Sequence, residues 1–403
     1  MIEKSIITKD GSQSKNLQSG SAAELLVPIV ITVFAVYITI GISLGVLPGF
    51  IKQVLGFDDI TVGAIIGMQA LATLLTRAYA GKITDTLGSK ISTQRGILLV
   101  LLAGIFYILA SSATAVPLFS LCLLALSRII HGIAESLLVT GILTWGIGLL
   151  GQQNTGRVMT WNGIAMYAGI AAGAPFSLWI VQSCTALAFS AILVLAMISW
   201  IATTGLPVVQ VIAGPVKTPF YKVISKVSSQ GLALAFSSIA FACIASFISL
   251  LFAQKNWSGA SLGFLFFGGS YILTRVLFSS YPDRFGGFKV AIISIIIEIT
   301  GQLCIGFSTE GCTAILGCAL TGIGFSLVFP ALGVLAVRKV SPQMRGTALG
   351  AYAAFFDLAL GTAGPIAGLI AGWFGYQTIY FFGAFSCLIA VVILFQSSKK
   401  ELQ

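Results

Sequence analysis

The chain has 403 residues, of which 57% are hydrophobic and only 8% are charged, with a formal net charge of +10. Soluble globular domains carry about 25% charged residues, so this composition excludes a water-soluble protein. Seven cysteines without a CxxC pair and a single histidine argue against a disulfide framework and a metal enzyme, and we expect no metal and no cofactor.

The expected elements begin with a polar segment, residues 1–24, which lacks the apolar core of a cleavable signal peptide and is predicted to be a cytoplasmic tail. A membrane-spanning helix needs about 20 mostly apolar residues. Such segments cover residues 25–49, 60–80, 95–114, 117–149, 158–182, 185–206, 228–253, 257–280, 288–308, 312–337, 347–371 and 376–396. We therefore predict an all-α membrane protein with twelve transmembrane helices.

The lysines and arginines between these segments orient the helices. If residues 1–24 lie inside the cell, 19 of the 22 Lys and Arg residues, Arg77 among them, fall on the cytoplasmic side. Lys52 and Lys255 fall outside, and Arg128 lies within a span. Cytoplasmic loops of membrane proteins are enriched in Lys and Arg. The pattern predicts that both termini are cytoplasmic, and the positive charge does not indicate a nucleic-acid partner.

The chain is predicted to contain two related halves. Residues 207–227 would be a cytoplasmic linker between an N-terminal six-helix bundle, 25–206, and a C-terminal one, 228–396, with a cytoplasmic tail at 397–403. Matching landmarks recur 188 to 198 residues apart: Asp85-Thr-Leu-Gly88 and Asp283-Arg284-Phe-Gly286, Arg157 and Arg345, and Gly173-Ala-Pro175 and Gly364-Pro365. Such a repeat predicts two pseudo-symmetric bundles that rock around a site at the membrane midplane.

The loop after the second span carries the first family motif. Gly81-Lys-Ile-Thr-Asp85-Thr-Leu-Gly88-Ser-Lys90 resembles the signature loop of the major facilitator superfamily, with Thr86 where a basic residue is usual. Asp283-Arg284-Phe-Gly286 is similar to the second copy of that loop. We expect a cytoplasmic latch, in which each Asp accepts hydrogen bonds from a helix start in the opposite half. The expected partners lie near Arg345 for Asp85 and near Arg157 for Asp283.

Longer stretches resemble a bacterial subgroup of this superfamily, the arabinose-efflux-like permeases, over nearly the whole chain. They include Leu-Thr-Arg77-Ala-Tyr-Ala-Gly-Lys, Val-Met-Thr-Trp161-Asn162-Gly and Arg345-Gly-Thr-Ala-Leu-Gly-Ala-Tyr-Ala-Ala-Phe-Phe-Asp357. The resemblance implies the superfamily's fold in a monomeric transporter of the bacterial inner membrane. It does not identify arabinose as the solute.

Small residues and proline mark two of the spans. The fifth span carries Gly169, Gly173 and Pro175, which resembles the glycine-rich fifth helix of the drug-proton antiporter branch and so implies export. The eleventh span repeats the pattern with Gly361, Gly364 and Pro365. Close helix packing in lipid is an alternative explanation for both.

Three acids, Glu135, Glu298 and Asp357, lie within predicted spans, where a charge costs about 2.5–3.5 kcal/mol on insertion scales. Arg128, His131 and Glu135 lie at helical spacing along one stripe of the fourth span. Arg128 and Glu135 could neutralise each other or a solute charge, and His131 could relay protons. We therefore predict that Glu135, Asp357, Arg128 and His131 couple transport to protons.

Seven further side chains form the predicted substrate cavity: Tyr37, Gln69, Trp145, Trp161, Asn162, Tyr352 and Phe356. The sequence contains no nucleophile–base pair and no Walker loop, so we expect neither an enzyme nor an ATP-driven pump. We predict a secondary transporter in the lipid bilayer, an antiporter that exports a small organic solute in exchange for protons. Two alternatives are a proton symporter that imports a sugar or another nutrient, and a non-transporting membrane sensor.

Overall fold

The computed structural model describes residues 22–151, 154–181, 184–209, 220–340 and 345–401, and within these ranges the structure is helical with no strand. Twelve of its helices are long and apolar enough to cross a membrane. The prediction of an all-α protein with twelve transmembrane helices is therefore confirmed. Many large apolar side chains on the outer surface are exposed, such as Trp179 at 71% and Phe307 at 72%, as expected for helices that face lipid.

The helices of the first half are α1 (Ala22–Gly49), α2 (Asp59–Leu87), α3 (Ser89–Ser112), α4 (Pro117–Leu150), α5 (Thr155–Ile180) and α6 (Thr185–Thr204), with a π-helical extension of α1, η2 (Phe50–Val54). The second half contains α7 (Phe220–Gln254), α8 (Ala260–Phe278), the short α9 (Tyr281–Phe285), α10 (Gly287–Gly306), α11 (Gly311–Arg338), α12 (Arg345–Phe374) and α13 (Tyr376–Glu401).

Several helices continue past the predicted spans. α2 runs to Leu87, and α7 begins at Phe220, inside the segment predicted as the linker. Hydropathy marks only the length that lies in hydrocarbon, whereas a helix can continue into water as long as its backbone hydrogen bonds continue. The tail before Ala22 and the middle of the predicted linker, residues 210–219, lie outside the described residues.

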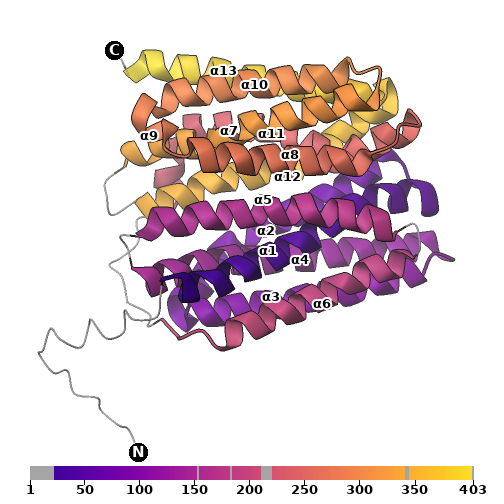
Figure 1. Ribbon diagram of the computed structural model, residues 1–403, viewed down its shortest axis with the longest axis horizontal. Coiled ribbons are helices and arrows are strands. Elements are labelled where there is room, and N and C mark those ends of the chain that lie inside the picture. The colour runs from indigo at the N-terminus through magenta and orange to yellow at the C-terminus, as the bar shows by residue number, and fades with distance from the viewer. Residues whose placement is uncertain (1–21, 152–153, 182–183, 210–219, 341–344, 402–403) are drawn as a thin grey trace, which may run out of the picture.

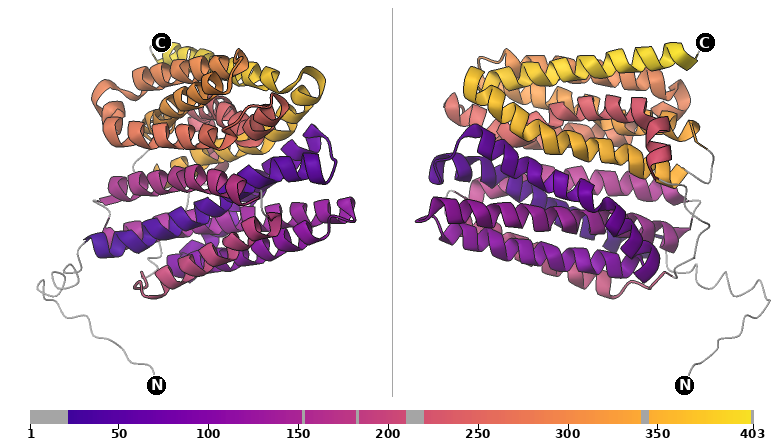
Figure 2. Two further views of the ribbon diagram at one scale, coloured as in Figure 1. Left: turned by 45° about the vertical axis from the view of Figure 1, so that its right-hand side comes forward. Right: turned by 180° about the vertical axis from the view of Figure 1, so that it is seen from behind.

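The two halves lie side by side, with α1–α6 in one and α7–α13 in the other (Figure 1). They contact each other mainly where α2 packs against α12 and α5 against α8. The start of α1 and the end of α13 lie at the same end of the molecule (Figure 2). This end, which also holds the α2–α3 turn, is called the termini side below.

Turns between helices follow from local chemistry. Gly88 and Gly286 have φ angles of 100° and 87°, which favour glycine, and each directly precedes the next helix of its half. The matching conformation supports the internal repeat. At the opposite end, Asp58 caps α2 by accepting a hydrogen bond from the Thr61 backbone N–H at 2.8 Å, and this bond together with the one from the Thr61 hydroxyl lowers the pKa of the Asp58 carboxyl.

Candidate substrate and proton site

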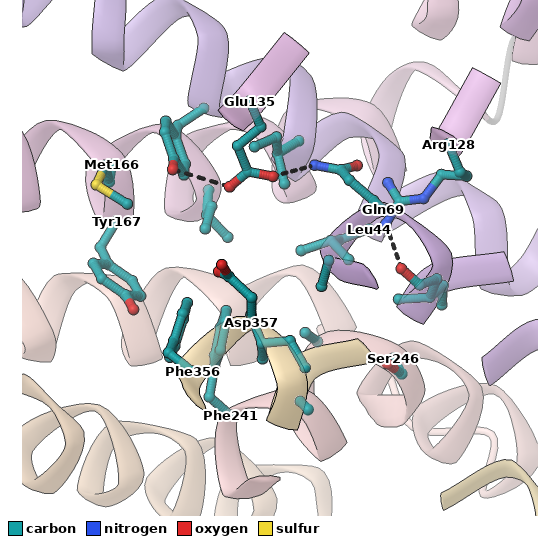
Figure 3. Close-up of a pocket in the computed structure, with 18 residues that line it drawn as sticks. Leu44, Gln69, Arg128, Glu135, Met166, Tyr167, Phe241, Ser246, Phe356 and Asp357 are labelled. Carbon is teal, nitrogen blue, oxygen red and sulfur yellow. Dashed lines mark hydrogen bonds between the residues drawn. The ribbon is translucent and has the colours of Figure 1, made fainter. Parts of the chain in front are cut away.

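A cavity of about 80 Å³ lies between the two halves. Its lining comes from α1, α2, α4 and α5 on one side and from α7 and α12 on the other (Figure 3). The lining residues are Tyr37, Ile40, Leu44, Ile66, Gln69, Ala70, Arg128, Glu135, Met166, Tyr167, Ile170, Phe241, Ala242, Ala245, Ser246, Phe356, Asp357 and Leu360. Most of this wall is apolar or aromatic, and the few charged groups come from α4 and α12.

Glu135 of α4 is held by three donors from neighbouring helices. Its carboxylate accepts hydrogen bonds from the Tyr37 hydroxyl at 3.0 Å, from Nε2 of Gln69 at 2.8 Å and from Oγ1 of Thr73 at 3.3 Å. Figure 3 shows the hydrogen bond between Glu135 and Gln69. Side chains of α1 and α2 therefore hold Glu135 at the cavity wall, and Glu135 forms no ion pair in the described part of the chain.

Asp357 of α12 forms an ion pair with Arg77 of α2. Nη2 of Arg77 donates to one carboxylate oxygen at 2.9 Å, and Nε donates to the other, so the contact is bidentate. The Asp357 side chain is 6% exposed and that of Arg77 22%. The ion pair joins the two halves beside the cavity.

Arg77, the ion-pair partner of Asp357, is a residue of the candidate site that the sequence reasoning missed. From the sequence we counted it only among the Lys and Arg residues of the cytoplasmic side, whereas its side chain turns toward α12 and pairs with Asp357. An arginine within the last turns of an apolar segment was a usable signal. Its partner could not be identified, because Asp357 lies 280 positions further along the chain.

Arg128 of α4 is 2% exposed, and its guanidinium binds backbone oxygens of α2. Nε donates to the Ile65 carbonyl at 3.2 Å and Nη2 to the Ile66 carbonyl at 2.7 Å, while Nη1 has no hydrogen-bond partner. In the described part of the chain, no carboxylate pairs with Arg128. The predicted neutralisation by Glu135 is thus not a direct ion pair.

His131 does not reach the cavity, although it lies between Arg128 and Glu135 in the sequence. It is fully buried, with Nε2 3.1 Å from Oγ1 of Thr39 and its ring edge-on to Tyr107. Oγ1 of Thr39 donates to the Val36 carbonyl at 2.6 Å, so Nε2 is the donor toward Thr39. On α4, with 3.6 residues per turn, His131 is rotated by roughly 40–60° from Arg128 and Glu135. Its side chain therefore faces α1 and α3 and lies apart from the predicted proton path.

Three of the seven predicted cavity residues, Tyr37, Gln69 and Phe356, line the cavity. The other four lie elsewhere. Trp145 donates to the Pro207 carbonyl at 2.9 Å, and Trp161 is 44% exposed. The Asn162 amide contacts Sδ of Met166 at 3.2 Å, and the Tyr352 hydroxyl donates to the Phe329 carbonyl at 3.0 Å. A polar or aromatic residue in an apolar helix does not reveal which way it faces, because lipid and protein interior are both apolar.

The sequence reasoning also missed lining residues on α5 and α7. The ring of Tyr167 lies 5.8 Å from that of Phe241 across the junction of the halves. A usable signal existed for Tyr167. Gly169 and Gly173 define the face of α5 that packs on α1, where a Cβ would meet backbone atoms of α1. Tyr167 lies two residues before Gly169 and therefore on the opposite face of α5. For Phe241 and Ser246 we find no comparable signal in α7.

The predicted latch residues lie at the termini side. Asp85 is exposed in the last turn of α2, Asp283 and Arg284 are exposed in α9, and Arg157 is exposed at the start of α5. α12 begins at Arg345, whose side chain lies outside the described part. Lys90 lies instead within the first half, where Nζ donates to the carbonyls of Thr204 and Leu206 at 2.9 and 2.7 Å. Gly81 has open space around its Cα.

The two glycine clusters have different packing roles. Gly169 and Gly173, which precede Pro175 in α5, pack on α1 inside the first half. Gly361, Gly364 and Pro365 of α12 pack across the junction on α2. A Cβ on Gly364 would overlap the carbonyl oxygen of Gly63. The α12 cluster therefore lets the backbones of the two halves touch.

Comparisons with known proteins agree with this architecture. A sequence profile described as Major Facilitator Superfamily matches residues 29–219 and 230–402. The chain is 39% identical over 376 residues to an uncharacterized MFS-type transporter, YhhS, of Escherichia coli (strain K12), which covers 93% of each protein. It is 40% identical over 369 residues to an uncharacterized MFS-type transporter of Burkholderia pseudomallei (strain 1106a), covering 91% of this chain and 90% of the relative.

Solved structures of similar shape include a D-xylose-proton symporter, with a TM-score of 0.75 and 14% identity over 92% of this chain and 97% of that one. The nucleoside transporter NupG matches with a TM-score of 0.69 and 19% identity over 92% of this chain and 98% of that one. At these identities the likeness shows the fold alone.

Proposed function

Since the chain belongs to the Major Facilitator Superfamily, whose members are transporters and not enzymes, we propose that it exports a small organic solute in exchange for protons. Transport would proceed by alternating access, with the two halves rocking around the cavity. The bacterial relatives support a place in the inner membrane. We keep the predicted orientation, with both termini in the cytoplasm, and the predicted monomer as parts of the proposal.

The observation that carries the proposal is that two acids from opposite halves, the partly buried Glu135 and the buried Asp357, line one cavity. Buried ionisable groups in membrane helices mark ion or proton pathways more often than packing contacts. Asp357 has the stronger support as the proton carrier, because its ion pair with Arg77 joins the halves and its charge state therefore bears on whether they stay together.

The proposed transport cycle depends on the Arg77–Asp357 ion pair. A proton that binds Asp357 from outside removes the negative charge of the ion pair, so α2 and α12 lose their charged contact beside the cavity. The halves then separate on the termini side, and the proton is released there. Solute enters the cavity from that side, and re-formation of the Arg77–Asp357 pair restores the outward-facing state.

Proton symport is the second candidate, and the free Nη1 of Arg128 favours it. An acidic solute bound there would bring a negative charge into a cavity that already holds Glu135. A proton on Glu135 would relieve that repulsion, so solute and proton would bind together and move in the same direction. We place export first because the glycine pattern of α5 resembles that of the drug-proton antiporter branch, and the experiment below distinguishes the two candidates.

The test uses proteoliposomes that enclose a pH-sensitive dye. The solute is first identified as the compound that accumulates in the medium of an overproducing strain and is depleted from that of a deletion strain. We expect solute movement to follow an imposed pH gradient, and to lose that dependence in Asp357→Asn and Glu135→Gln. If both variants keep full gradient-driven transport, the coupling assignment is wrong. Counterflow against gradients of either sign then separates antiport from symport.

A further inference from the structure

We propose that the transported solute is a small carboxylic acid with an apolar body, and that its carboxylate binds the free edge of the Arg128 guanidinium. The inference rests on the proposed function only in taking the cavity between the halves as the solute site, and it holds for export and for the symport candidate alike. It names the chemical class of the solute and the residue that selects it.

No carboxylate pairs directly with Arg128 in the described part of the chain. A guanidinium carries five N–H donors and one positive charge, and here only the Ile65 and Ile66 carbonyls accept from it. Carbonyl oxygens satisfy donors but carry no formal charge. A buried, unpaired charge costs several kcal/mol, so natural proteins keep one mainly where a ligand supplies the counter-charge.

The acids on the same cavity are already engaged. Glu135 receives hydrogen bonds from Tyr37, Gln69 and Thr73, and Asp357 receives both of its bonds from Arg77. Arg77 and Asp357 together are neutral. The positive charge that remains available to an incoming molecule is therefore the one on Arg128, whose Nη1 is buried without a partner.

A second unpaired atom lies next to it. Nε2 of Gln69 donates to Glu135, which fixes the direction of the amide, and Oε1 is left buried without a donor. Figure 3 shows the Gln69 side chain between Glu135 and Arg128. A carboxylate on Nη1 of Arg128 together with a hydroxyl toward Oε1 of Gln69 would satisfy both atoms.

The remaining wall suits the apolar part of such a molecule. Phe241 and Phe356 come from the second half, Tyr167 and Met166 from α5, and all four lie away from Arg128 in Figure 3. A site that is polar at one end and aromatic along the rest orients an amphipathic acid. A free inorganic anion would leave the aromatic wall unfilled.

The experiment measures binding of radiolabelled mandelate, a hydroxy acid with a phenyl ring, to the detergent-purified full chain by equilibrium dialysis at neutral pH without a gradient. We expect saturable binding that excess unlabelled mandelate removes. The neutral analogue mandelamide and the cation benzylamine should compete poorly. Arg128→Gln should weaken binding by about tenfold or more, as expected for a hydrogen bond to a charged group.

Two variants control for charge and folding. Arg95→Gln removes a positive charge from an exposed position on α3 of the same half and should bind mandelate like the parent. Glu135→Gln removes a negative charge from the cavity and should tighten binding severalfold, a gain that damage to the fold would not produce. Thermal unfolding is recorded for every variant. If Arg128→Gln does not fold, the inference is tested by the other two results, poor competition by mandelamide and tighter mandelate binding in Glu135→Gln.

The inference is overturned if mandelate does not bind the parent chain at millimolar concentration, if mandelamide competes as well as mandelate, or if a folded Arg128→Gln keeps the parent affinity. Because no proton gradient is present, these outcomes are independent of coupling. Failure of the proposed proton exchange would appear only in the proteoliposome assay, with mandelate binding intact.

Discussion

The guanidinium of Arg77 in α2 and the carboxylate of Asp357 in α12 form a bidentate ion pair that connects the two halves on the termini side of the cavity. On the other side of the cavity, the backbones of Gly63 and Gly364 touch. Gly63 and Arg77 are about 20 Å apart along α2 at 1.5 Å per residue. The α2–α12 junction is thus held by a titratable contact at one end and by an uncharged one at the other.

Breaking the ion pair from one side only should be costly. Arg77→Gln leaves the Asp357 carboxylate buried without a cation, and loss of one partner of a buried pair costs about 3–5 kcal/mol. Thermal unfolding of the purified protein should therefore show a large loss for each single variant. The double variant Arg77→Gln with Asp357→Asn should lose clearly less than the sum of the two single losses. Additive losses would mean that the two side chains do not stabilise each other.

The contact between Gly63 and Gly364 should not accommodate even one added methyl group. Gly364→Ala places a Cβ against the backbone oxygen of Gly63, and overpacking of this kind costs about 1–3 kcal/mol. Gly372→Ala in the same helix is the matched control, because a Cβ there has open space around it. We expect a lower unfolding temperature for the first variant and an unchanged or higher one for the second, since alanine favours helices. Equal behaviour of the two would contradict the close contact.

His131 should matter for stability and not for coupling. His131→Asn removes the imidazole from its place between Thr39 and Tyr107, which we expect to cost about 1–3 kcal/mol of unfolding free energy. Transport driven by a pH gradient should persist once expression is normalised, whereas Asp357→Asn should lose it. If His131→Asn abolishes gradient-driven transport but keeps counterflow, the imidazole belongs to the proton path after all.

The sequence predicted the large-scale architecture because its signals are local. Each of the twelve apolar segments can be identified by itself, because its length must match the thickness of the bilayer. Gly88 and Gly286 can likewise be identified as turn residues in equivalent loops. The same sequence singled out Glu135 and Asp357 as proton-coupling residues because charge within an apolar span is rare, and both side chains line the cavity.

The facing of individual side chains was harder to predict, for a physical reason. In a soluble helix, water on one face separates polar from apolar positions. A membrane helix has an apolar surrounding on every side, so Trp145 and Trp161 carried no directional signal, and neither lines the cavity. The Arg77–Asp357 pair depends on how the two halves dock, which is a property of the tertiary fold and not of either helix.

Native cysteines offer a test of the predicted orientation. Cys184, before α6, and Cys312, at the start of α11, are both exposed, and both lie at the end of the molecule opposite the termini side. If the termini are cytoplasmic, a membrane-impermeant maleimide added to intact spheroplasts should label these two cysteines, and the Cys184→Ser, Cys312→Ser variant should lose the label. Thr86→Cys in that variant background, at an exposed position on the termini side, should be labelled only after the membrane is permeabilised. The opposite labelling pattern would invert the topology and, with it, the direction assigned to the proton-driven cycle.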